Sequence, residues 1–271
     1  MKLISIVIPT KNSAKTLEQC LESIKKQSYQ NYELIIVDGS SSDKTGEKAR
    51  QFTNKFFVSA HERSEARNFG FSKAEGDIFL SIDSDMVLEK NVLRDIAKGV
   101  KEHDALIIPE VSYGNDFISR CKDLEKRCYM EDDIVEASRV FPRNVFEDVK
   151  GYDANLVFGE DWDIHSRIKQ KYRIGRIKSK IFHSTQSMSL ISDLKKSYKY
   201  GKTLQRYLAK GHPQAKKWLD LRKIFFIRHF STLKREPVCA AGLTVLKGME
   251  YAAGFIGFLA VKLGADDGSS V

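Results

Sequence analysis

The sequence predicts an α/β fold in which helices cover both faces of a mostly parallel sheet. Short apolar runs alternate with helical patterns over the first 110 residues, as expected for parallel strands joined by crossover helices. The chain of 271 residues is 42% hydrophobic and 30% charged, which suits one soluble α/β domain with an appendage. We therefore expect a catalytic domain at 1–189 and a helical, basic extension at 190–271.

Five apolar runs predict the strands of the sheet. They lie at Leu3–Ile8, Leu34–Val37, Phe56–Val58, Ile78–Ile82 and Ala105–Ile108. Between the first two strands, Leu17, Cys20, Leu21 and Ile24 share one face of a helix, and a similar pattern covers 91–100. Further helices are expected at 44–51 and around Arg63 and Arg67, ahead of the fourth strand.

Residues 111–182 are less regular. We expect a helix around 116–130, a strand near 134–141, a helix begun by Pro142, and a helix opened by Glu160-Asp161-Trp162-Asp163. One strand around Arg173–Phe182 closes the domain at His183.

The extension carries the excess positive charge of the chain. Residues 190–235 hold thirteen Lys or Arg against two Asp, a net +11, so the net +9 of the whole chain leaves −2 for the remainder. Amphipathic helices are expected over 194–208 and 218–230, followed by an apolar element at 238–263. A solvated or oligomerising helical arm and a nucleic-acid patch are alternatives, but the apolar element favours attachment to a membrane surface.

We expect no conventional membrane-spanning helix, because Lys247, Glu250 and Lys262 interrupt the last apolar element. No signal peptide is expected from the first residues, whose apolar run ends at Pro9. The four cysteines are too widely spread for a disulfide framework, so we interpret them as reduced thiols in a cytosolic compartment.

Polar residues follow three of the predicted strands directly. They are Thr10-Lys11-Asn12, Asp38–Asp43 and Asp83-Ser84-Asp85. Ligands of open α/β sheets bind outside the carboxyl ends of the strands, so all three segments are expected at one rim.

Asp83 and Asp85 are the strongest candidates for a metal site. Two carboxylates at i and i+2 in a turn can reach a common point, and their hard oxygen atoms favour Mg²⁺ or Mn²⁺ bridging to a diphosphate. Asp-x-Asp is also common as a polar turn or helix cap. We expect Asp38, Asp83 and Asp85 to converge within reach of one cation.

Other side chains could bind the nucleotide or act in catalysis. Asp38 could accept a hydrogen bond from a nucleobase or a ribose, while Asp43 suits the cap of the next helix. Arg63 and Arg67 could contact phosphate or base, or lie on a solvated surface. No Gly-x-Gly-x-x-Gly follows the first strand and no Gly-Lys-Ser/Thr loop occurs, which argues against a dehydrogenase or a P-loop enzyme.

The acidic cluster at Glu160–Asp163 has two interpretations. It complements the dipole of the helix that it opens, and one of its carboxylates could act as a general base toward an acceptor hydroxyl. His183, at a strand end, could serve as a third metal ligand or contact the diphosphate, although a lone histidine is more often structural.

Together, and in this order, these segments resemble the family-2 glycosyltransferases with the GT-A fold. The matching text is Ser5–Asn12, Leu34–Asp43, Ala66-Arg-Asn-Phe-Gly70, Ile82-Asp-Ser-Asp85, Gly159-Glu-Asp-Trp-Asp163 and His183. The resemblance covers roughly residues 3–185 and implies a Rossmann-like GT-A sheet.

The resemblance also implies roles for single residues. Pro9, Lys11 and Asp38 would line the nucleobase pocket, and Arg67 would support the nucleotide. Asp83 and Ser84 would face the ribose or sugar of the donor. Mn²⁺ or Mg²⁺ would be held by Asp85, with Asp83 and His183 as further ligands. Asp161 would be the catalytic base of an inverting displacement, with Glu160 beside it. Lys11 stands where such proteins often carry Arg or Tyr.

The expected activity is transfer of a sugar from a nucleoside diphosphate sugar, UDP- in preference to GDP-, to a hydroxyl acceptor. A phosphate acceptor already carries charge, since its second pKa is about 6, and needs no base, so the Glu160-Asp161 pair favours a hydroxyl on a glycan or a lipid-linked saccharide. Alternatives are a polyprenyl- or dolichyl-phosphate sugar synthase and a non-catalytic, membrane-docked nucleotide-sugar-binding protein. We expect a peripheral or monotopic location on the cytoplasmic side of a membrane and no nucleic-acid partner. The sequence leaves open whether the chain forms homo-oligomers.

Overall fold

The computed structural model describes residues 2–114, 116–130, 135–184, 190–209 and 225–263. The chain divides into two compact units, which are treated separately below. Unit 1 comprises residues 1–111, 136–154 and 160–184, and unit 2 comprises residues 112–135, 155–159 and 185–271. The expected division at residue 189 stays a prediction, but unit 2 also takes in two segments that precede residue 160.

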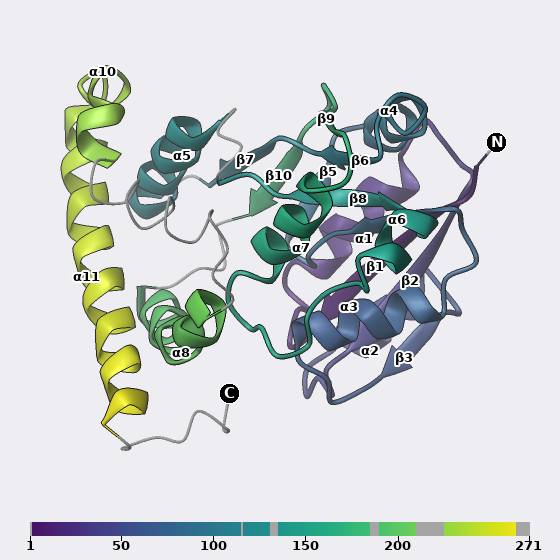
Figure 1. Cartoon of the computed structure of the whole chain (residues 1–271), viewed down its shortest axis with the longest axis horizontal. Helices are drawn as coiled ribbons and strands as arrows, with labels where there is room; N and C mark the ends of the chain where they lie inside the picture. The colour runs from purple at the N-terminus through teal and green to yellow at the C-terminus, as the bar shows by residue number, and fades with distance from the viewer. Residues whose placement is uncertain (1, 115, 131–134, 185–189, 210–224, 264–271) are drawn as a thin grey trace. The chain divides into compact units, whose positions relative to one another are not determined.

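Unit 1 is built on a seven-stranded sheet with the order β3-β2-β1-β4-β8-β6-β9 (Figure 1). The strands are β1 (Ile4–Thr10), β2 (Tyr32–Asp38), β3 (Phe56–Val58), β4 (Ile78–Ser81), β6 (Ala105–Ile107), β8 (Ser138–Pro142) and β9 (Ile174–Arg176). Strands β1 to β4 pair in parallel, β6 pairs in parallel with β9, and β8 runs antiparallel to both β4 and β6. The mostly parallel α/β sheet predicted from the sequence is confirmed.

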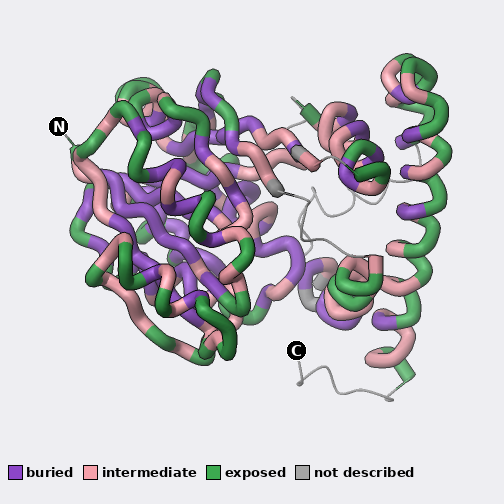
Figure 2. Tube along the Cα trace, turned by 180° about the vertical axis from the view of Figure 1, so that it is seen from behind, coloured by how far each residue is buried: buried purple, intermediate pink, exposed green. Residues whose placement is uncertain are grey.

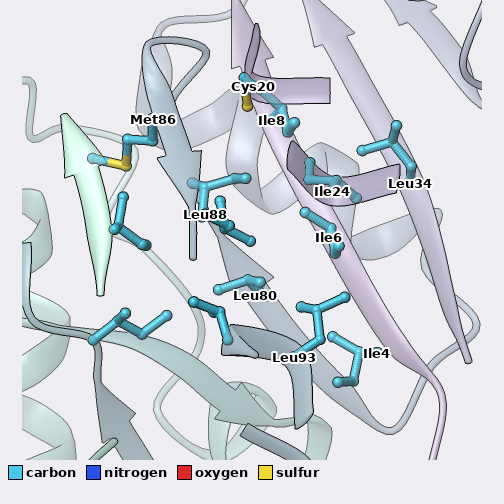
Figure 3. Close-up of a cluster of buried hydrophobic side chains, with 14 of the residues drawn as sticks. Ile4, Ile6, Ile8, Cys20, Ile24, Leu34, Leu80, Met86, Leu88 and Leu93 are labelled. Carbon is cyan, nitrogen blue, oxygen red and sulfur yellow. The ribbon is translucent and has the colours of Figure 1, made fainter. Parts of the chain in front are cut away.

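Helices cover both faces of this sheet. They are α1 (Leu17–Lys25), α2 (Thr45–Ala49), α3 (Arg63–Ser72), α4 (Val92–Gly99), α6 (Arg143–Asp148) and α7 (Glu160–Lys169). Successive side chains of a strand point to opposite faces, so Ile4, Ile6 and Ile8 of β1 pack on one side and Val7 on the other. The first side meets α1 and α4, as Figure 3 shows for Ile24 and Leu93. The second side meets α3, α6 and α7.

The expected single strand at 173–182 is wrong, because two short strands occupy that stretch. After β9, residues 177–180 turn, and β10 (Ile181–Ser184) pairs antiparallel with β5 (Met86–Leu88) outside the main sheet. Ile177 and Ile181 are both buried, so the apolar pattern continues through a turn that the periodicity alone does not reveal. The pairing places His183 opposite Met86. β7 (Glu110–Tyr113) contains the boundary between the units.

Unit 2 is helical. Its elements are α5 (Phe117–Tyr129), α8 (Leu190–Ala209), α10 (Phe230–Leu233) and α11 (Pro237–Lys262). Cys121, Leu124 and Cys128 of α5 share a buried cluster with Leu243 and Leu246 of α11. The expected helix at 218–230 lies for the most part outside the described residues. All four cysteines are free and buried.

Helix α11 coincides, to within one residue at each end, with the apolar element expected at 238–263. Its 26 residues are apolar enough, by length and composition, to cross a membrane, and 11% of its most apolar window is buried. Figure 2 shows it mainly in the colours of exposed and half-buried residues. Val238, Val245 and Ile256 are 70%, 62% and 59% exposed. Length and composition thus make α11 a candidate spanning segment within the described residues, while the expectation that it is not a conventional spanning helix stays a prediction. Lys247 and Glu250 contact each other along the helix at 2.7 Å.

Candidate active site

The loops that follow β1, β2 and β4 adjoin at one rim of unit 1, as predicted. The backbone amide of Asn12 donates to Ser41 Oγ at 2.8 Å. The backbone amide of Ser42 donates to the side-chain oxygen Oδ1 of Asn12 at 2.9 Å. Ser84 Oγ donates to Ser13 Oγ at 2.8 Å and thereby connects the third loop. Asn12 and Ser40 adopt positive φ angles of 50° and 61°, a backbone region that is costly for side-chain-bearing residues and is found at ligand sites.

Asp38 secures this rim from inside. Asp38 is only 3% exposed. Its carboxylate accepts hydrogen bonds from Thr10 Oγ1 at 2.8 Å and from the backbone amide and hydroxyl of Ser41 at 2.8 and 2.6 Å. Three of about four acceptor positions of the carboxylate are thus used within the protein. A ligand hydrogen bond to Asp38 would use the remaining position.

Arg67 is the centre of a buried ionic cluster. The residue is 0% exposed because α3 packs its inner face on the sheet. Its Nη2 donates to Asp83 Oδ1 at 2.9 Å, and its Nη1 donates to Asp161 Oδ1 at 2.8 Å and lies 3.4 Å from Glu160 Oε1. The guanidinium also lies 5.1 Å from the ring centroid of Tyr152. Arg67 therefore connects the end of β4 to the first turn of α7.

Arg139 was not predicted from the sequence, and it completes the cluster. It lies on β8, beside β4, and is 9% exposed. Its Nε donates to Glu110 Oε1 at 2.5 Å, and its Nη1 lies 3.8 Å from Asp83 Oδ2. An arginine inside the strand Ser138-Arg139-Val140-Phe141 was the available signal, because an arginine in a buried strand requires carboxylate partners.

Three arginines favour the charged form of Asp83. Burial by itself would raise the pKa of the Asp83 carboxyl, but Arg67, Arg63 and Arg139 outweigh burial and hold that pKa well below its usual range. Burial and the neighbouring Asp161 raise the pKa of Glu160. Two adjacent carboxyl groups thus have different surroundings, with Glu160 5% exposed and the Asp161 side chain 25% exposed.

Asp85 and His183 form a second pair. Asp85 directly precedes β5, and His183 lies on β10, which pairs with β5. His183 Nε2 lies 3.0 Å from Asp85 Oδ2. Asp85 Oδ1 is buried and has no hydrogen-bond partner among the described residues. A buried carboxylate oxygen without a donor is costly unless a cation or another ligand approaches it, so this pair fits a divalent cation.

The expected convergence of three carboxylates on one cation is not seen. The described residues contain no group of three or more His, Cys, Asp and Glu side chains that could hold a metal ion. Asp83 faces Arg67 and Arg139 instead, and Asp38 is hydrogen-bonded within its own loop. Both oxygens of Asp83 are thus opposite arginine side chains.

The remaining predicted residues lie on the same rim. Pro9 is half-buried in β1, Lys11 is exposed beyond it, and Ser84 is half-buried between Asp83 and Asp85. Glu160 and Asp161 open α7, where their charge complements the helix dipole. The roles of these residues toward a ligand stay predictions. The rim can offer backbone and lysine hydrogen-bond donors to a nucleotide, and the Asp85–His183 pair to a cation. The partly exposed Asp161 carboxylate can accept a proton.

Comparison with known sequences gives one family. The model described as "Glycosyl transferase family 2" matches residues 5–193. Glycosyltransferase GlyG of Streptococcus pneumoniae is 37% identical over 114 residues, 40% of this chain and 38% of that protein. A "PGL/p-HBAD biosynthesis glycosyltransferase" of Mycobacterium bovis is 29% identical over 181 residues, 61% of this chain and 69% of that protein. The match to GlyG spans well under half of that relative's length.

Comparison with solved structures shows the fold. TarS 1-349 of S. aureus, in complex with UDP-GlcNAc, superposes with a TM-score of 0.59 at 18% identity, over 97% of this chain and 92% of that chain. The mannosyltransferase PcManGT of Pyrobaculum calidifontis, in complex with GDP-Man and Mn²⁺, superposes with a TM-score of 0.60 at 16% identity, over 97% and 79% of the two chains.

Proposed function

Because the chain belongs to glycosyl transferase family 2, we propose that it moves a sugar from a nucleoside diphosphate sugar to a hydroxyl acceptor with inversion at the anomeric carbon. The observation that carries the proposal is the contact of Arg67 with Asp161 at 2.8 Å and Asp83 at 2.9 Å. This contact fixes the Asp161 carboxylate, which is 25% exposed, beside the rim where the strands end.

Asp161 is the base of the proposed reaction. Its carboxylate takes the proton of the acceptor hydroxyl while the hydroxyl oxygen forms a bond to the anomeric carbon. The bond between that carbon and the diphosphate oxygen breaks, and the electron pair leaves with the nucleoside diphosphate. Arg67 orients Asp161 for this step, because its Nη1 holds Asp161 Oδ1 in place. Glu160, which is nearly fully buried, supports the position of Arg67.

The donor occupies the rim formed by the three loops. Lys11 and Pro9 border the nucleobase, and Asp38 offers its remaining acceptor position to the base or ribose. We propose a UDP-sugar as donor in preference to a GDP-sugar. The TarS complex with UDP-GlcNAc and the PcManGT complex with GDP-Man make both nucleotides the ones to test.

Asp85 and His183 would hold a divalent cation, Mn²⁺ or Mg²⁺. Such a cation supplies charge neutralisation at the leaving diphosphate. Two protein ligands suffice because these cations commonly keep water and phosphate oxygens in the other positions. In this proposal Asp83 is not a ligand, since both of its oxygens face arginines.

Unit 2 attaches the enzyme to a membrane surface. The exposed apolar residues of α11 and the lysines of α8 support this proposal, because basic side chains attract anionic lipid and apolar ones enter the interface. A peripheral or monotopic enzyme on the cytoplasmic side would find a lipid-linked saccharide as acceptor.

A second candidate is a polyprenyl-phosphate sugar synthase. It is supported by the dolichol-phosphate mannosyltransferase of Pyrococcus furiosus, which is 30% identical over 112 residues, 39% of this chain. The acceptor phosphate would then attack without a base. The geometry of Asp161 favours the hydroxyl acceptor.

The test is release of nucleoside diphosphate from UDP- and GDP-sugars by wild type and by Asp161→Asn, with Mn²⁺ and with either a saccharide or a polyprenyl phosphate as acceptor. We expect saccharide-dependent release that falls by about 10²–10⁴-fold in the variant, with donor binding retained. Equal release by both proteins with polyprenyl phosphate would favour the second candidate. Donor binding without any release would indicate a non-catalytic binding protein.

A further inference from the structure

Unit 2 contains an apolar pocket between α8 and α11 that the proposed reaction does not use. Its volume is about 370 Å³, within the range of small-molecule sites. Tyr200, Leu204 and Leu208 line it from α8, Phe255 and Phe258 from α11, and Phe158 from the segment before α7. An aromatic and aliphatic lining of this kind favours a hydrocarbon occupant.

The two helices leave this pocket open because they touch closely at glycines. A Cβ atom on Gly201 would collide with the carbonyl oxygen of Gly254, and one on Gly257 would collide with that of Tyr198. Small residues that bring helix backbones together are typical of helix pairs that pack in lipid. Gly201 and Gly254 themselves line the pocket, together with the larger side chains that flank them.

Positive charge lies at the pocket, and its acidic lining residue is already paired. Lys196 Nζ lies 5.6 Å from the ring centroid of the lining residue Tyr200. Glu250 also lines the pocket, but Lys247 contacts it at 2.7 Å. An occupant with an apolar chain and an anionic group at the end of that chain complements this arrangement.

We propose that the pocket binds one hydrocarbon chain of an anionic phospholipid, whose phosphate contacts Lys196. The occupant is a membrane phospholipid because α11, which forms one wall, is long and apolar enough to cross a bilayer and also exposes Val245 and Ile256. The proposal extends the membrane attachment described above by giving unit 2 a specific lipid site.

The first test uses lipid that is monomeric in solution, so it does not depend on membrane attachment. Binding of dihexanoyl-phosphatidylglycerol to the full-length protein is measured by calorimetry, with dihexanoyl-phosphatidylcholine for comparison. We expect the anionic lipid to bind more tightly. Lys196→Gln should weaken its binding by about five-fold, the value of one lysine near an anionic lipid, and Lys195→Gln, the exposed neighbour on α8, should leave it unchanged.

Filling the pocket tests the apolar part. Leu204→Trp should reduce lipid binding by roughly ten-fold or more, because the chain loses its apolar burial. Ile191→Trp, at an exposed apolar position of α8 that does not line the pocket, is the matched control and should have no effect. Leu208→Trp repeats the test if Leu204→Trp lowers the melting temperature.

A photoactivatable phosphatidylglycerol in vesicles of equal phosphatidylcholine and phosphatidylglycerol locates the chain. Cross-links concentrated in 197–208 and 250–258, and lost in Leu204→Trp, are expected. Equal affinity for both short-chain lipids and for all variants, or cross-links spread evenly along α11, would overturn the proposal. Sugar transfer to a soluble acceptor is measured in parallel. If the pocket does not bind lipid, the lipid tests fail but sugar transfer is still observed. If the proposed function is wrong, no sugar transfer is observed, while lipid binding still shows the expected pattern.

Discussion

At the scale of single residues, Arg67 decides how the carboxylates of the site are used. It is fully buried and contacts Asp83, Asp161 and Glu160. A buried arginine is tolerated only with such partners, and removing it leaves carboxylates without compensation. The sequence indicated Arg67 as a nucleotide contact, and that role stays a prediction. Its contacts with Asp161 and Asp83 support the further proposal that it positions Asp161.

Arg67→Met should therefore destabilise unit 1 by about 3 kcal/mol or more, since three carboxylates lose their shared cation. Guanidinium denaturation followed by circular dichroism measures this change. Lys171→Met is the control, because the side chains of Lys171 and its partner Asp148 are 58% and 43% exposed and an exposed pair contributes about 0–1 kcal/mol. Equal effects of the two changes would contradict the central position of Arg67.

The sequence predicted the rim residues better than their partners. Asp38, Asp83 and Asp85 follow apolar strands directly, so their location at strand ends was predictable from local pattern. The pairing of Asp83 with Arg139 was not, because Arg139 reaches Asp83 from β8, more than 50 residues later in the chain. Long-range charge pairing of this kind leaves no local periodicity.

At the scale of elements, strand ends were predicted correctly where apolar runs are bounded by polar or glycine-rich sequence. A strand end was missed where the turn that follows it is itself apolar. The segment 173–182 contains two strands in two sheets, separated by a turn with buried Ile177. The division matters for function because β10 alone positions His183 opposite Met86, next to Asp85.

The contact between α8 and α11 gives a prediction for two glycines of the same helix. Gly257→Ala should destabilise unit 2 by about 1–3 kcal/mol, because the added methyl group collides with the Tyr198 carbonyl. Gly248→Ala meets nothing within 4 Å and should stabilise α11 by up to about 1 kcal/mol. Thermal unfolding with limited proteolysis of α8 measures both, and a destabilising Gly248→Ala would refute the packing described.

At the scale of the whole molecule, the chain combines a family-2 transferase unit with a helical unit that holds the apolar helix α11. The basic extension after residue 190 was visible from composition alone. The inclusion of 112–135 and 155–159 in unit 2 was not, because it results from packing of α5 against α11 across more than 100 residues of sequence.

Membrane attachment is expected to depend on the exposed face of α11. Replacing Val245 and Ile256 by Asp should release the protein from vesicles containing phosphatidylglycerol, because charged groups do not enter the apolar interface. Gln51→Asp, at an exposed position of unit 1, adds a similar charge and should leave co-sedimentation unchanged. Retention of the doubly substituted protein on vesicles would show that α11 is not the attachment element.

The most direct test of the account is the change in melting temperature caused by UDP-GlcNAc, with and without Mn²⁺, in wild type and in Asp85→Asn. At a ligand concentration of about 100 times Kd, binding stabilises the folded state by about 2.7 kcal/mol, or roughly 5–10 °C for a domain of this size. The account predicts this shift for wild type with Mn²⁺, a much smaller shift without the metal, and its loss in Asp85→Asn. A shift that is independent of Mn²⁺ and equal in both proteins would contradict a cation site at Asp85 and His183.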